Sequence, residues 1–272
     1  MASIPSPSRL KEHRRAVWLK ESWLRFSGAI LQTRMTVISV EGGLLLHSPS
    51  PAALTPEIRQ ELEALGTPRY LVAPNEIHNV GLVAFQRAYP TAHTTGCAGH
   101  PKRVKAARFD TVLDVSGPPD AAPWTRSGEL EFHVIGGNRF LHEIALFHRP
   151  SKTLVLTDAL EFIDAARHLA PPLPPRWACN LMTRLGFRFS APCMSPEHHL
   201  LCRDPVAVRA SLEAIERWSF DSVVIAHGRL LEGQQGRDAV REAFTLTIRA
   251  AETRRAPARL LWGVLSKVAG GN

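Results

Sequence analysis

The sequence predicts a mixed α/β domain in which helices cover both faces of a largely buried sheet. Short apolar runs, such as RYLVA at 69–73 and DSVVIAHG at 221–228, alternate with amphipathic segments of helical period. Three strand-like runs also follow one another between residues 129 and 160 with short links, which favours antiparallel neighbours. With 272 residues and 44% hydrophobic content, the chain can bury a substantial core.

The first half of the chain shows clear start and stop signals. Two strand-like runs flank Gly42 and Gly43, which is typical of a hairpin. Thr55 can cap a helix that Gly66 ends. The elements expected next are a strand at 69–73, a short helix at 80–88, a strand at 91–97, a basic helix at 100–108 and a strand at 109–115.

The second half adds the strands between 129 and 160, a helix that begins after Asp204, a buried strand at 221–228 and a long helix from about Gly236. The segment 161–203 contains the proline cluster PPLPP, and we expect it to be an insertion outside the sheet. The predicted organisation is an N-terminal arm at 1–34, the main domain at 35–256 and a C-terminal tail at 257–272. Within the arm, we expect an amphipathic piece that contains Trp18 and Trp23.

Composition narrows the class of protein. The net charge of +8 is spread along the chain, and its densest group, HPKRVKAAR at 100–108, has no aromatic RNA-binding motif beside it, so there is no specific nucleic-acid signal. The four cysteines form no CxxC pair, which favours reduced thiols and a cytoplasmic location. No secretory signal and no apolar run of transmembrane length is present.

Three polar residues stand directly after buried strands. His78 follows the run at 69–73, Asp158 follows KTLVLT, and His227 ends SVVIAH. In open α/β sheets this edge is where ligands bind. Two imidazoles and a carboxylate can bind zinc, or ferrous iron as a two-His-one-carboxylate face. The alternatives are that Asp158 caps a turn, that His227 is a packed loop histidine and that His78 is a hydrogen-bonded turn residue.

The motifs around these residues resemble those of the metallo-β-lactamase superfamily. TLVLTDAL is similar to the strand that ends in its metal-bridging Asp, SVVIAHG to its last strand with the final His ligand, and LVAPNEIHNVG to the HxHxDH loop. The combination RMTV…LLLHSP, APN..H and P.SKTL..TD more closely resembles the DUF4336 branch. The resemblance implies an αββα metallo-β-lactamase-like sandwich with mixed sheets.

The departures from HxHxDH limit what the resemblance implies about the site. The four motif positions are Ala73, Asn75, Ile77 and His78, so only the last histidine remains. The family's middle His ligand should fall near 138–142, where His142 could substitute. The resemblance therefore implies at most a mononuclear centre, with His78, Asp158 and His227 as metal ligands and one zinc or iron ion, or none. The catalytic residues stay unassigned, and no other cofactor is expected.

Two functions remain open from the sequence. One is a metal-dependent hydrolase that acts on a small-molecule ester or thioester through a metal-activated water, whose pKa zinc lowers to about 7. The other is a non-catalytic binding or scaffold protein, with an unknown partner, on a decayed hydrolase fold. With Ile77 at the family's catalytic Asp position, the candidates for a base are Glu76, Glu143 and Glu161. The cluster CMSPEHHLLC at 193–202 has metal-binding side chains but matches no common zinc module.

Overall fold

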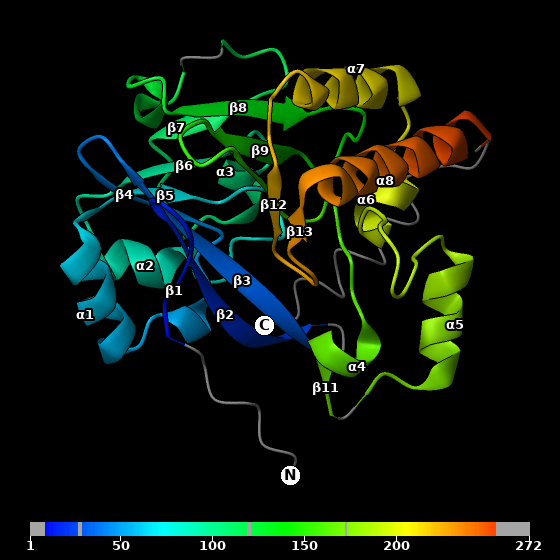
Figure 1. Ribbon diagram of the computed structural model, residues 1–272, viewed down its shortest axis with the longest axis horizontal. Coiled ribbons are helices and arrows are strands. Elements are labelled where there is room, and N and C mark those ends of the chain that lie inside the picture. Colours follow the sequence, from blue (N-terminus) through cyan, green and yellow to red (C-terminus); the bar gives the residue numbers. More distant parts are fainter. Residues whose placement is uncertain (1–8, 27–28, 119–120, 172, 254–272) are drawn as a thin grey trace.

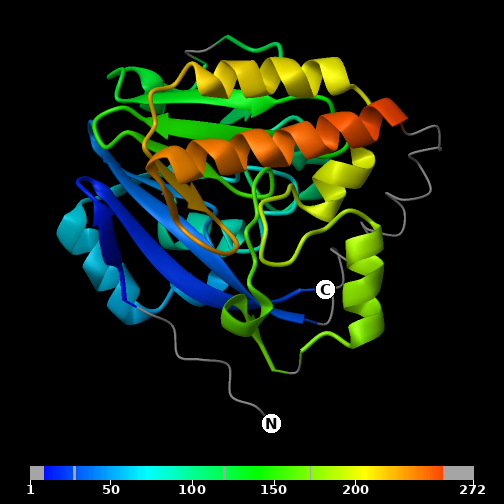
Figure 2. The same cartoon turned by 45° about the vertical axis from the view of Figure 1, so that its right-hand side comes forward.

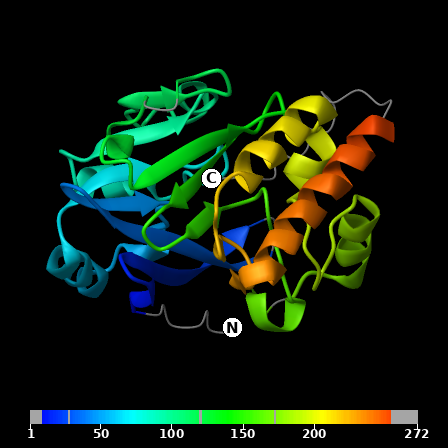
Figure 3. The ribbon, with the colours of Figure 1, turned by 45° about the horizontal axis from the view of Figure 1, so that its top comes forward.

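Two β-sheets pack face to face, and helices cover the outer face of each sheet (Figure 1; Figure 3). The structure is a computed structural model, and it describes residues 9–26, 29–118, 121–171 and 173–253. The layers follow the order helix, sheet, sheet, helix, and both sheets mix parallel and antiparallel neighbours. The predicted αββα sandwich with mixed sheets is confirmed.

The first sheet has the order β1-β2-β3-β4-β5-β6-β7, and β11 pairs with β3. Its strands are β1 (Lys11–Arg14), β2 (Val17–Phe26), β3 (Ala29–Val40), β4 (Gly43–His47), β5 (Pro68–Val72), β6 (His93–Cys97), β7 (Thr111–Leu113) and β11 (Leu169–Ala170). The hairpin expected around Gly42 and Gly43 is present as β3 and β4. The second sheet has the order β13-β12-β10-β9-β8, with strands β8 (Leu130–Ile135), β9 (Glu143–His148), β10 (Thr153–Leu156), β12 (Ser222–Ile225) and β13 (Leu231–Glu232).

Helices α1 and α2 cover the first sheet, while α7 and α8 cover the second (Figure 2). The helices are α1 (Pro56–Leu65), α2 (Leu82–Ala88), α3 (His100–Arg103), α4 (Ala165–His168), α5 (Arg176–Arg184), α6 (Pro196–Leu201), α7 (Pro205–Glu216) and α8 (Gly233–Thr253), with 3₁₀ turns η1 (Pro51–Ala53) and η2 (Pro123–Thr125). Thr55 caps α1 as expected, because its side chain accepts a hydrogen bond from the Ile58 amide. None of the helices in the described ranges has the length and apolarity needed to cross a membrane.

Alternating side chains build the three apolar layers. On β10, Leu154 and Leu156 pack toward α7 and α8, while Val155 faces the other sheet. On β12, Val223 and Ile225 repeat the first direction and Val224 the second. This alternation follows from the two-residue period of a strand. It explains why these strands read as continuous apolar runs, since both of their faces are buried.

Several predicted boundaries are wrong. Residues 11–34 do not form an arm, because β1, β2 and the first half of β3 belong to the first sheet. Trp18 and Trp23 lie on β2, paired with β3, and not on an amphipathic piece outside the sheet. The basic helix expected at 100–108 is shorter, because α3 spans only His100–Arg103. The segment 161–203 lies outside the sheets except for β11, and the predicted tail at 257–272 lies outside the described residues.

Candidate metal site

The strand register places Asp158 beside His227. Strands β10 and β12 run in parallel with Leu156 opposite Ile225, and each polar residue lies two positions beyond its strand. His78 arrives from the other sheet, on the loop that follows β5. That loop is joined to β9 by a hydrogen bond of 2.8 Å from the Ile144 amide to the Pro74 carbonyl. The candidate site thus lies where the ends of the two sheets meet.

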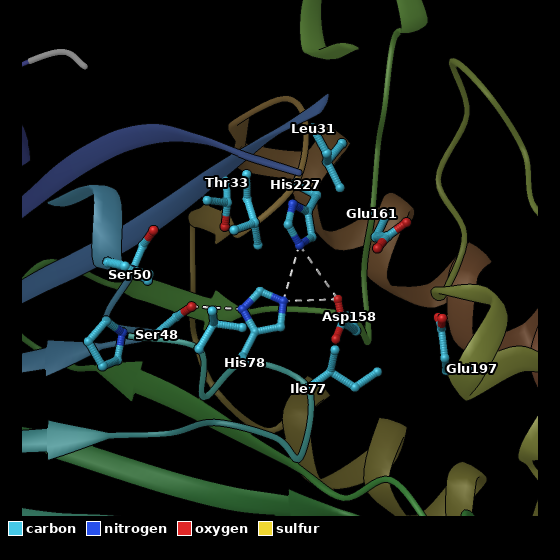
Figure 4. Close-up of a pocket in the computed structure, with 14 residues that line it drawn as sticks. Leu31, Thr33, Ser48, Ser50, Ile77, His78, Asp158, Glu161, Glu197 and His227 are labelled. Atoms are coloured by element: carbon cyan, nitrogen blue, oxygen red, sulfur yellow. Dashed lines mark hydrogen bonds and ion pairs between the residues drawn. The ribbon is translucent and has the colours of Figure 1, made fainter. Parts of the chain in front are cut away.

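Three ligand-type atoms converge at this point (Figure 4). Nε2 of His78 lies 3.2 Å from Oδ1 of Asp158 and 3.1 Å from Nε2 of His227. Nε2 of His227 lies 3.9 Å from the same carboxylate oxygen. In the described part of the chain, no other group of three His, Cys, Asp or Glu side chains comes together in this way. The structure therefore brings together all three residues that the sequence singled out.

The spacing of these atoms suits a metal ion. A tetrahedral zinc with bonds of about 2.0–2.1 Å has ligand atoms about 3.3–3.4 Å apart. The separations of 3.1, 3.2 and 3.9 Å lie on both sides of that value. Two imidazole nitrogens and one carboxylate oxygen also form a donor set that zinc and iron accept. By donor chemistry and by distance, the residues present fit one metal ion.

Hydrogen bonds orient both imidazoles toward this point. Nδ1 of His227 lies 2.8 Å from the backbone carbonyl of Gln32, which can only accept, so the proton is on Nδ1 and a lone pair remains on Nε2 of a neutral ring. Nδ1 of His78 lies 2.7 Å from the Ser48 hydroxyl. Such partners on the far nitrogen are typical of metal-binding histidines, because they set the tautomer and the ring orientation.

The pKa values of the two histidines are shifted in opposite directions. Burial lowers the pKa of His78, but the charge of Asp158 and its hydrogen bond outweigh burial, so the net pKa is raised. Burial and the neighbouring His78 lower the pKa of His227 to about 4. Burial alone would raise the pKa of Asp158, yet His78 holds that pKa below its usual range. A proton on His78 thus occupies the position between the three atoms that a cation would take.

Asn75 stands at a ligand position of the HxHxDH motif, but its side chain forms hydrogen bonds instead. Its Nδ2 lies 2.8 Å from Oδ2 of Asp158, 3.0 Å from Oγ1 of Thr157 and 3.2 Å from Oε2 of Glu143. Its Oδ1 accepts hydrogen bonds of 2.9 Å from the amides of Ile77 and His78. Asn75 therefore both holds the turn that presents His78 and positions the Asp158 carboxylate.

Glu143 is fully buried, and its carboxylate is held by backbone amides and a histidine. It accepts hydrogen bonds from the amides of Thr157 and Asp158 at 2.8 Å and of Ala159 at 3.0 Å. Nε2 of His198 lies 3.4 Å from it. These partners fix the loop that carries Asp158. They also occupy Glu143, so this residue is not available as a base.

Glu76 is also occupied by structural partners. Its carboxylate lies 2.8 Å from Nδ1 of His142 and accepts a 2.8 Å hydrogen bond from the His142 amide. His142 consequently does not replace the missing histidine of the resembled motif. In the cluster at 193–202, His198 faces Glu143 and His199 lies 3.1 Å from the Thr247 hydroxyl, so these side chains serve packing and hydrogen bonding.

A small pocket opens beside the three converging atoms. Its volume is about 70 Å³, and it is lined by Leu24, Leu31, Thr33, Ser48, Pro49, Ser50, Pro51, Ile77, His78, Val80, Asp158, Glu161, Glu197 and His227. Since one water needs about 10–15 Å³, this space holds an ion with a few waters or a small ligand group. Burial and the charge of Asp158 raise the pKa of Glu197, and they raise the pKa of Glu161 well above its usual value.

Sequence reasoning missed the network around the three residues. The sequence shows Asn75 only as a departure from the HxHxDH motif, and it gives no sign of the Ser48 hydroxyl. Ser48 directly follows β4 with a positive φ of 56°, a conformation that non-glycine residues adopt rarely. Neither signal is visible in a sequence, because both depend on contacts between the two sheets.

The fold and the site geometry define a protein of the metallo-β-lactamase fold class. Residues 14–172 match the family described as "Domain of unknown function (DUF4336)". This is more than half of the chain, and the chain belongs to that family. No curated protein matches the sequence.

Solved structures with the same fold are similar over nearly the whole chain. DIM-1 metallo-β-lactamase exposed to ceftazidime has a TM-score of 0.59 at 12% identity, over 92% of this chain and 99% of that one. The metallo-β-lactamase FIM-1 from Pseudomonas aeruginosa in its mono-zinc form gives 0.55 at 13%, over 91% and 97%. The metal-soaked Flv1 flavodiiron core from Synechocystis sp. PCC6803 gives 0.58 at 14%, over 90% and 62%. At these identities the likeness shows the fold alone.

Proposed function

We propose that this protein is a hydrolase that uses a single metal ion held by His78, Asp158 and His227. One observation carries the proposal: two imidazole nitrogens and a carboxylate oxygen converge within 3.1–3.9 Å in a buried pocket at the sheet ends. A centre with three protein ligands and an open position is the arrangement of catalytic zinc. The proposal of a single ion is supported by FIM-1, a metallo-β-lactamase of similar fold whose structure was solved in a mono-zinc form.

The chain's own residues have distinct parts in this proposal. When bound, zinc or iron supplies Lewis-acid activation of water and of the scissile carbonyl. His78 and His227 offer their Nε2 atoms, because Ser48 and the Gln32 carbonyl occupy the other nitrogens. Asn75 holds Asp158 by its second oxygen and leaves Oδ1 directed at the site. The other half of a two-metal centre is missing, because Ala73 and Asn75 stand at its ligand positions.

The pocket suggests a small substrate. Apolar side chains such as Leu24, Leu31 and Val80 also line the pocket, which suits a short acyl group of an ester or thioester. We also propose a cytoplasmic location, supported by four cysteines that are all free.

A non-catalytic binding protein is the second candidate. The observation that favours it is the closed hydrogen-bond network of Asn75, which satisfies Asp158, Thr157 and Glu143 without any ion. In that case the proton on His78 permanently takes the place of the metal.

Hydrolysis assays on purified, metal-loaded protein distinguish the two functions. We expect turnover of p-nitrophenyl acetate or of a short acyl thioester by the wild type and a loss of turnover in Asp158→Asn. Asp238→Asn is the matched control, because Asp238 is an exposed residue of α8 whose carboxylate lies 3.6 Å from Arg241. Equal rates in the wild type and Asp158→Asn, or no turnover by a wild type shown to hold metal, would contradict the hydrolase proposal and favour a binding protein.

A further inference from the structure

Glu161 is the one candidate base that the structure leaves facing the pocket. The residue is 6% exposed, and it lines the cavity with Asp158 and His227. Figure 4 shows it on the opposite side of the pocket from Ser48, next to Asp158. Among the described residues, no N–H group donates to its carboxylate, in contrast to Glu76 and Glu143, which are held by amides and histidines. Glu161 is thus a buried acid that, among the described residues, no amide or histidine holds in place.

The backbone holds Glu161 in this place from two sides. Its amide donates to the Cys193 carbonyl at 2.8 Å, and the Cys193 amide donates back at 3.1 Å. The next residue, Phe162, bridges to Gly228 directly after His227. Because this pairing ties Glu161 to the same loop as His227, the position of its side chain beside the site is built into the fold.

Carboxyl groups gather at this pocket, and a cation would stabilise their charged forms. Asp158, Glu161 and Glu197 all line it, and no Lys or Arg is present among the described lining residues. Burying a carboxylate without a counter-charge is strongly unfavourable, and two adjacent carboxylates increase this cost. The charge of Asp158 is one of the causes that raise the pKa of Glu161 well above its usual value, after burial. A divalent ion between two neutral imidazoles and these two carboxylates would leave the buried group without net charge.

We propose that Glu161 is the fourth protein side chain of the metal centre. Its carboxylate lies outside the three atoms that stand within 4.8 Å of one another, and it turns toward the ion when metal binds, so that it supplies, with Asp158, a second oxygen donor. The inference rests on the proposed metal site and specifies its chemistry. Two imidazoles with two carboxylates form a harder donor set than two imidazoles with one, and added oxygen donors favour Mn²⁺ and Fe²⁺ relative to zinc. The centre is therefore suited to manganese or ferrous iron as well as zinc.

Metal titration of the apo-protein tests this role without an activity assay. Mn²⁺ and Zn²⁺ affinities are measured by competition with a fluorescent chelator, for the wild type, Glu161→Gln, Glu197→Gln and Asp158→Asn. We expect Glu161→Gln to weaken Mn²⁺ binding by about 10- to 100-fold and Zn²⁺ binding less, which follows the usual effect of removing a carboxylate at a metal site. Glu197→Gln is the control, because Glu197 lines the same pocket and should change both affinities little.

The visible spectrum of the Co²⁺-loaded protein gives a second readout. Loss of a ligand in Glu161→Gln should change the absorption bands, while Glu197→Gln keeps the wild-type spectrum. Should Glu161→Gln fail to fold, Glu161→Asp keeps the charge, shortens the side chain and should also bind Mn²⁺ more weakly.

The outcomes separate the inference from the proposed function. Wild-type affinities and spectrum in Glu161→Gln, with binding lost in Asp158→Asn, would overturn the role of Glu161 and leave the three-residue site standing. A wild type that binds none of the three metals would overturn the metal site itself. Selective loss of Mn²⁺ binding in Glu161→Gln supports both.

Discussion

Nε2 of His227 lies 3.1 Å from Nε2 of His78. Two imidazole nitrogens at this distance need either a shared proton or an ion between them, because two lone pairs repel. Asp158 stands 3.2 Å from the same nitrogen of His78, so both a proton and a metal ion are stabilised there. The site is therefore a place where a metal ion and a proton compete.

Metal addition should stabilise the folded protein. A ligand that binds only the native state raises the free energy of unfolding by about 2.7 kcal/mol at a concentration 100 times its Kd. Thermal unfolding with and without Zn²⁺ measures this, and a chelator should reverse it. In His227→Gln the increase should be absent. An equal increase in that variant would show that the metal binds elsewhere.

Asn75→Ala should destabilise the fold and weaken the site. The change removes the hydrogen bonds of Nδ2 to three oxygens and those of Oδ1 to the amides of Ile77 and His78. At about 1 kcal/mol for each net bond, with partial replacement by water, the loss should be about 2–4 kcal/mol. Urea unfolding monitored by circular dichroism measures it.

The control for Asn75→Ala is Asn79→Ala on the same turn. Asn79 donates one side-chain hydrogen bond, of 2.7 Å, to the Glu76 carbonyl. We expect a loss of about 1 kcal/mol or less there. Similar losses in both variants would show that Asn75 is an ordinary turn residue.

The pair of Glu76 and His142 should stabilise the protein most at mildly acidic pH. Burial would raise the pKa of the Glu76 carboxyl, but the hydrogen bonds and the charge of His142 together lower it, and the hydrogen bond to Glu76 raises the pKa of His142. A histidine whose pKa is raised by folding stabilises the folded state fully below its pKa in the unfolded chain, which is about 6.5. This stabilisation disappears as the pH rises through the pKa of the histidine in the folded protein. Unfolding of His142→Gln should therefore show a deficit at pH 5.5 that shrinks at pH 8.5. A deficit that is constant with pH would argue against charge pairing.

His47 should make the protein sensitive to acid. It is 1% exposed at the end of β4, its Nε2 has no hydrogen-bond partner within the described residues, and burial lowers its pKa to about 3. Below about pH 6.5, His47 binds a proton in the unfolded chain but stays neutral in the folded chain. The free energy of unfolding therefore falls by up to about 1.4 kcal/mol for each unit that the pH drops between the unfolded and the folded pKa of His47. His47→Gln should flatten this slope between pH 6 and pH 4. Parallel stability curves for variant and wild type would contradict the assignment.

The strands of the core could be predicted because both of their faces are buried. Runs such as TLVL and SVVI on β10 and β12 leave no alternative to a buried strand, and the Thr55 cap and Gly66 mark the ends of α1. The N-terminal strands were missed because β2 carries charged side chains among its apolar ones. Lys20, for example, is fully buried on β2 and donates to the Glu21 carbonyl. Such burial depends on neighbours that a local pattern does not contain.

For the site, the sequence was sufficient to name the three converging residues and not their surroundings. His78, Asp158 and His227 could be named because each follows an apolar strand. The roles of Asn75 and Glu143 could not be predicted, because their partners are distant in the sequence. The oxygens that Asn75 Nδ2 binds lie 68 to 83 positions away, and the amides that donate to Glu143 lie 14 to 16 positions away. Glu161 was one of three equal candidates until the structure showed which carboxylates are already occupied.

The convergence of His78, Asp158 and His227 points to one metal ion bound between them. The most direct measurement is anomalous X-ray diffraction from crystals of the protein soaked in Zn²⁺, collected above and below the zinc absorption edge. We predict a single anomalous peak within bonding distance, about 2.0–2.2 Å, of both Nε2 atoms and of Oδ1 of Asp158. A map with no peak there, while His78 and His227 remain in direct contact, would contradict metal binding at this place.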